Sequence, residues 1–177
     1  MYTTDAIVLK KIDVGEHDAL YMLYTQGYGK MRAVAAGIKK PEAKLRGHLE
    51  PLSLSRVRFV AGKNRERLIG ASMLNFWSSM REDVHKLSVG HYIASRMDRE
   101  CMEGQKDEAL WNLLEQSFSR LNSHDDFAPV AGAFINDFEH NLQSALGYGG
   151  AEGAFYGGFG DGAESPEYGI ITHYGQA

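Results

Sequence analysis

The residues 18-DALYMLYTQGYGKMRAVAA-36 form two runs of aromatic and aliphatic residues on either side of a glycine-rich turn. Runs of this composition and length, 18–26 and 29–36, predict β-strands. The connection between them, with Gly27 and Gly29, is short enough for a β-hairpin. This segment therefore predicts two neighbouring antiparallel strands near the N-terminus.

Three further runs have the same character, and they cover residues 4–12, 50–60 and 66–74. Turn residues separate all five runs, and the longest connection, 37–49, has room for a helical turn over 42–48. Five short strands with an insertion after the third predict an OB-fold, a five-stranded Greek-key barrel that often binds nucleic acid. An SH3-like barrel or an open sheet would give nearly the same pattern.

The alternation of side chains along a strand places the charges of this half. In the third run, Lys30 and Arg32 share one face, opposite a methionine and two alanines. In the fourth run the apolar residues change from one parity to the other midway, so a bulge near Ser55 is expected. Arg56 and Arg58 point to the same side of that strand. Alternation thus predicts one pair of cations on a face of the third strand and another pair on a face of the fourth strand.

The second half of the chain predicts a helical bundle, because apolar residues recur at helical spacing in three segments. The predicted helices cover about residues 78–102, 107–122 and 129–146. Ser78 or Ser79 is the expected N-cap of the first helix, Asp107 that of the second, and Gly147 ends the third.

The fold class that follows is α+β, with a five-stranded OB-fold-like β-barrel followed by an α-helical domain. The expected boundaries are 1–76 for the barrel, 77–148 for the helical domain and 149–177 for a C-terminal tail. Ten of the last 31 residues are glycine, interleaved with aromatic residues. A segment of this composition cannot bury much surface, so we expect the tail to be flexible.

The net charge of −4 is an average over two very different halves. Residues 1–70 carry a net charge of +6 and residues 71–177 a net charge of −10. Eleven lysines and arginines lie between Lys30 and Arg67, a clustering that a merely solvated surface explains poorly. We therefore expect DNA binding through phosphate contacts. The cations expected to contribute are Lys30, Arg32, Lys39, Lys40, Lys44, Arg46, Arg56 and Arg58.

The composition excludes several other classes of protein. No stretch approaches the roughly 18 apolar residues of a membrane span, and no signal peptide is visible, so we expect a cytoplasmic protein without a membrane partner. The single cysteine, Cys101, excludes an internal disulfide and a multi-cysteine zinc site. We expect neither a metal nor a cofactor.

The first 75 residues resemble the N-terminal domain of the RecO family of DNA repair proteins. The resemblance is carried by the order and spacing of the segments 6–9 (AIVL), 15–18 (GEHD), 24–30 (YTQGYGK), 32–40 (RAVAAGIKK) and 45–52 (LRGHLEPL). A weaker likeness ends at 146–149 (LGYG). Many members of the family then carry a four-cysteine zinc module, which this sequence lacks.

The resemblance implies an OB-fold and a non-enzymatic role in DNA repair and recombination. RecO-like proteins bind single- and double-stranded DNA without sequence preference, anneal complementary strands, and are associated with the nucleoid. They engage the acidic C-terminal tail of single-stranded-DNA-binding protein, pair with RecR, and help load RecA onto coated single strands. We expect the same partners here.

A catalytic alternative rests on carboxylate–histidine pairs one helical turn apart, as in di-metal bundles. The pairs are Glu82 with His85 and Asp137 with His140, and Glu100 or Glu115 could complete a site. Such sites need four facing helices, and only three are predicted.

Two further alternatives keep the barrel. It could be an RNA-binding module, or the chain could be an adaptor whose helices bind protein. In the adaptor, an apolar groove flanked by some of Arg81, Lys86, Arg96 and Arg99 could accept an acidic tail.

Tyrosines offer a possible contact to bases through stacking. Tyr21, Tyr24 and Tyr28 all lie in or beside the predicted hairpin. Tyr21 and Tyr24 fall on opposite faces of one strand, so at least one of them is expected in the core.

Overall fold

The computed structural model describes residues 1–40, 43, 45–62 and 65–148. The predicted tail and the candidate cation Lys44 lie outside the described residues, and so does the side chain of Arg46. Among the described residues, no helix has the length and apolar character needed to span a membrane.

The N-terminal half is a closed five-stranded barrel, which confirms the OB-fold prediction. Its strands pair in the order β1-β2-β3-β5-β4, and only β3 and β5 run parallel. A 3-10 turn, η1 (Arg46–His48), lies in the long connection after β3, where a helical turn was expected. The strands are β1 (Tyr2–Val14), β2 (Asp18–Thr25), β3 (Gly29–Ala35), β4 (Leu54–Val60) and β5 (Glu66–Asn75).

The middle of strand β1, residues 6–9, is buried on both faces, and this explains its continuous apolar run. Ala6 and Val8 point into the barrel, whereas Ile7 and Leu9 belong to a second core that the helices complete. Strand β2 follows the same rule, since its interior residues alternate with residues that face the helices. A strand covered on both sides carries no apolar–polar alternation.

The change of parity in β4 has the same cause. Leu54 packs against the core of the helical half, whereas Val57 and Phe59 fill the barrel. The pairing with β5 shifts by one residue between Leu54 and Ser55, as the sequence predicted. Arg56 is left on the outer face of the barrel.

The helical half contains four helices instead of three. They are α1 (Ser78–Glu82), α2 (Val84–Glu100), α3 (Glu108–Ser123) and α4 (Ala131–Ala145), with a 3-10 turn, η2 (Ala128–Val130), before α4. Asp107 caps α3 by accepting a hydrogen bond from the backbone N–H of Leu110 at 3.0 Å, as predicted. Gly147, at φ 84°, ends the last helix as expected.

The prediction of one continuous helix over 78–102 is wrong. The chain breaks at Asp83, whose carboxylate accepts hydrogen bonds from the backbone N–H of His85 (2.8 Å) and of Lys86 (3.2 Å) and so starts α2. Neither Ser78 nor Ser79 caps α1, because the residue in the cap position is Trp77, in a left-handed conformation with φ 48°.

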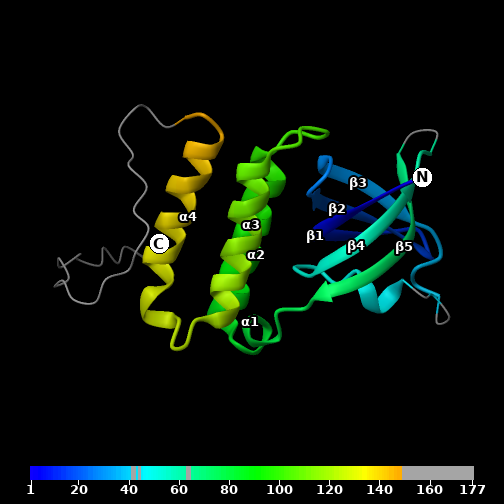
Figure 1. The fold of residues 1–177 in the computed structure, drawn as a ribbon. Helices are drawn as coiled ribbons and strands as arrows, with labels where there is room; N and C mark the ends of the chain where they lie inside the picture. Colours follow the sequence, from blue (N-terminus) through cyan, green and yellow to red (C-terminus); the bar gives the residue numbers. More distant parts are fainter. Residues whose placement is uncertain (41–42, 44, 63–64, 149–177) are drawn as a thin grey trace, which may run out of the picture.

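Figure 1 shows the helices stacked on one side of the barrel, with α4 farthest from it. Helix α2 packs closely against Leu52 of the barrel half and Met80 of α1 at Gly90. An added Cβ there would lie 3.1 Å from Met80 Sδ and 3.3 Å from Leu52 Cδ1. Ile7, Leu52 and the helices share one hydrophobic core. The barrel and the helical half are therefore held together by burial of apolar surface.

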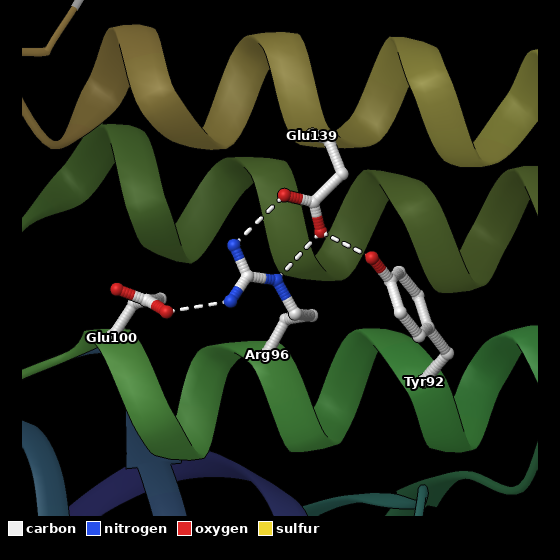
Figure 2. Close-up of polar contacts among 4 residues, drawn as sticks. All are labelled: Tyr92, Arg96, Glu100 and Glu139. Atoms are coloured by element: carbon white, nitrogen blue, oxygen red, sulfur yellow. Dashed lines mark hydrogen bonds and ion pairs between the residues drawn. The ribbon is translucent and has the colours of Figure 1, made fainter.

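A partly buried ion network fixes α4 to α2 (Figure 2). Arg96 donates two hydrogen bonds to the carboxylate of Glu139, at 2.7 and 2.8 Å, and one to Glu100 at 2.5 Å. The hydroxyl of Tyr92 donates to Glu139 at 2.7 Å. The hydrogen bonds from Arg96 are the main reason that the pKa of Glu139 lies below its usual value.

Candidate nucleic-acid interface

The two cations of β3 are engaged with the helical half. The ammonium of Lys30 lies 2.9 Å from Asp98 Oδ1 on α2 and also donates to the backbone carbonyl of Asp98. Its side chain is only 9% exposed. Arg32, which is about half exposed, pairs with Glu103 in the loop between α2 and α3. Burial and pairing with Asp98 therefore argue against Lys30 as a phosphate contact.

The α2–α3 loop is pressed against the start of β3. The backbone N–H of Gly104 donates to the carbonyl of Lys30 at 2.9 Å. A Cβ at Gly29, which has φ 69°, would lie 1.9 Å from the carbonyl oxygen of Gln105. This part of the β2–β3 surface, which OB-folds commonly use for nucleic acid, is thus covered by the protein itself.

Arg56 and Arg58 lie side by side on the outer face of β4. The guanidinium of Arg56 donates two hydrogen bonds to Asp5, at 2.7 and 3.0 Å, and these raise its pKa. Its side chain remains 57% exposed. The Asp5 side chain is only 23% exposed and the pair is bidentate, so a phosphate that binds Arg56 has to compete with Asp5 for the guanidinium.

Arg58 lies flat across the neighbouring strand. A Cβ at its cross-strand partner Gly70 would be 2.5 Å from Arg58 Nε. The absence of a side chain at Gly70 therefore gives the guanidinium its place. Within the described part of the chain Arg58 forms no ion pair.

One arginine that was not selected from the sequence joins this face. Arg67 on β5 is exposed and pairs in register with Val60 of β4. It belongs to the cationic cluster visible in the sequence. Its proximity to the β4 arginines follows from the antiparallel pairing of β4 with β5, which the charge pattern does not reveal. Arg56, Arg58 and Arg67 are called the β4–β5 face below.

The loop cations differ among themselves. Lys39 donates to the carbonyl of Gly15 at 2.8 Å and lies 3.5 Å from Asp13, so it ties two loops of the barrel together. Lys40 is exposed. Of the six predicted cations whose side chains the structure describes, it therefore brings together two, Arg56 and Arg58, in one exposed surface.

Of the three candidate tyrosines, two are core residues. Tyr21 is 1% exposed in the barrel interior and Tyr24 is 0% exposed against the helices, so burial raises the pKa of both. The expectation that at least one of them is core is confirmed. Tyr28 is 41% exposed.

The residues of the catalytic alternative do not converge. Asp137 pairs with Arg120 at 2.9 Å, and Glu100 belongs to the Arg96 network. Within the described residues, no group of three or more His, Cys, Asp or Glu side chains could hold a metal ion. The carboxylate–histidine pairs therefore do not form the di-metal arrangement considered from the sequence.

Comparisons with known proteins agree on one family. Residues 1–77 match the family model described as "Recombination protein O N terminal". The chain is 35% identical over 143 residues to "DNA repair protein RecO" of Syntrophomonas wolfei, covering 81% of this chain and 56% of that protein. Identity to the protein of the same name is 31% in Moorella thermoacetica, over 76% of this chain and 50% of the relative. Identity to the protein of the same name in Geobacter metallireducens is 31%, over 82% of this chain and 58% of the relative. The chain spans about half the length of these curated relatives.

Proposed function

The chain belongs to the RecO family, and on this premise we propose that it acts in DNA repair and recombination by binding DNA without reading its sequence. The observation that carries the proposal is the β4–β5 face, where Arg56, Arg58 and Arg67 lie exposed on two paired strands. Contacts to phosphate give affinity but no base identity, which suits a protein that works on any sequence.

The same surface is suited to strand annealing. Two complementary strands must approach each other while their backbone repulsion is reduced and their bases stay free to pair. An exposed arginine-rich surface reduces the repulsion, and its contacts to phosphate leave the bases free. We propose that the protein is not an enzyme, that it anneals complementary single strands, and that it works at the nucleoid in the cytoplasm.

The partners proposed from the family are RecR, RecA and the acidic tail of single-stranded-DNA-binding protein. Most cations considered for the tail have internal roles. Arg81 donates to the carbonyl of Pro51 at 2.6 Å and lies over the ring of Phe76, and Lys86 is 5% exposed. Arg96 is paired with two glutamates, which leaves Arg99 as the exposed member of that set.

The test is fluorescence anisotropy of a labelled mixed-sequence oligonucleotide, with Arg58→Glu as the variant. Arg99→Glu is the matched control, since it makes the same charge change on the helical half. We expect Arg58→Glu to weaken DNA binding and Arg99→Glu to leave it unchanged. Equal effects of the two variants would contradict the assignment of the face. Tighter binding of RNA than of DNA in competition would instead favour an RNA-binding module.

A further inference from the structure

Tyr28 is the outermost of three aromatic rings that run from the barrel interior to the surface. Phe59 is fully buried, and its ring centroid lies 5.5 Å from that of Tyr2. The ring of Tyr2 lies 4.8 Å from that of Tyr28, with the planes tilted by 53°. Tyr28 is thus supported from below by packed rings while 41% of its surface remains open.

The turn that carries Tyr28 is held by hydrogen bonds. The hydroxyl of Thr25 accepts from the backbone N–H of Tyr28 at 3.1 Å and donates to the carbonyl of Gly29 at 2.8 Å. The backbone N–H of Gly27 donates to Thr4 Oγ1 at 3.0 Å. Because the Tyr28 ring is already fixed in place, little side-chain entropy is lost when a ligand packs on it.

Clefts with cations flank this turn on both sides. One cleft, of about 440 Å³, is lined by Gln26 and Gly27 together with Arg56 and Lys106. The other, of about 480 Å³, is lined by residues that follow the turn and by Arg65. Both clefts also contain carboxylates, Asp5 and Glu108 in the first and Glu66 and Glu103 in the second. Arg56 and Lys106 on one side and Arg65 on the other are the cations that a polyanion crossing the turn would meet.

We propose that Tyr28 stacks against an unpaired base of single-stranded DNA, while Arg56 and Lys106 on one side and Arg65 on the other hold the neighbouring phosphates. This inference rests on the proposed function and adds a preference for single strands. In a duplex the bases already stack on one another, so their faces are not accessible to the tyrosine.

The test compares Tyr28→Ala with Tyr28→Phe and with the control Tyr148→Ala, which removes a tyrosine that is 76% exposed at the end of the helical half. Loss of a stacking ring lowers affinity by about 5- to 150-fold. We expect this loss for Tyr28→Ala on single-stranded DNA, no loss on duplex DNA, and near wild-type binding for the other two variants. The salt dependence should not change, because no charge is removed.

A second measurement on the unmodified protein keeps the inference testable if Tyr28→Ala folds poorly. A single-stranded oligonucleotide with 5-iodouracil should photocrosslink to Tyr28, located by mass spectrometry. If the wild type binds DNA but Tyr28→Ala binds single strands equally well, or if crosslinks form only elsewhere, the stacking site is wrong and the β4–β5 face stands. If the wild type binds no DNA, both proposals fall.

Discussion

Lys30 provides a sharp test of the distinction between structural and DNA-binding cations. Its side chain is 9% exposed, and its ammonium lies 2.9 Å from Asp98 Oδ1 and so joins β3 to the end of α2. The substitution Lys30→Met keeps most of the side-chain volume and removes the charge. Asp98 then loses its partner, and the junction between the barrel and the helical half is weakened.

The expected magnitude follows from the exposure of the two partners. Breaking a fully buried ion pair typically costs about 3–5 kcal/mol. Because the Asp98 side chain is 27% exposed, water can solvate the abandoned carboxylate. We therefore expect Lys30→Met to lower the free energy of unfolding by about 1–3 kcal/mol. In a domain of this size that corresponds to a decrease in Tm of about 2 to 12 °C.

The assay combines thermal and urea unfolding with DNA binding as a function of salt. Lys40→Met is the control, because an exposed loop cation should change stability by less than about 0.5 kcal/mol. Lys30→Met should destabilise the protein and leave the salt dependence of DNA binding unchanged. The reasoning is refuted if Lys30→Met unfolds like the wild type and yet weakens DNA binding in a salt-dependent way.

Two further predictions concern the helical half. Glu139→Gln should lower Tm near neutral pH by about 2 to 4 °C, and this difference should vanish in acid. The pKa of Glu139 is lower in the folded than in the unfolded protein. The ionised carboxylate therefore stabilises the fold above the unfolded pKa, and this stabilisation is lost as the pH falls through the folded pKa. A Tm difference that stays constant from pH 7 to pH 3 would contradict this. Asp83→Ala should lower Tm by about 2 to 4 °C, because α2 loses its N-cap. Asp83→Asn keeps a capping oxygen and should retain most of the wild-type stability. Equal losses of stability in the two variants would argue against capping.

Local patterns predicted the elements of this fold well because strands, turns and caps depend on neighbouring residues. The five strands, the bulge near Ser55 and the cap at Asp107 were all visible in this way. The break at Asp83 was missed, since the apolar stripe continues through it and only the hydrogen bonds to His85 and Lys86 show that a new helix begins.

The candidate site was harder to predict, because a charge pattern does not show which cations face solvent. Lys30 and Arg32 look like surface residues in the sequence, but a loop more than 60 residues later packs on them. Arg67 becomes part of the site only through the pairing of β5 with β4. Both facts depend on contacts between segments distant in the sequence, and the periodicity of a single strand gives no information about such contacts.

The central claim is that the β4–β5 face binds DNA through phosphates. The most direct test is the slope of log affinity against log salt for a single-stranded oligonucleotide, in the wild type and in the triple variant Arg56→Gln/Arg58→Gln/Arg67→Gln. Each lost phosphate contact reduces the slope by about 0.7. Three lost contacts should therefore make the slope shallower by about 2. A folded triple variant with the wild-type slope and affinity would show that DNA, if it binds, binds elsewhere.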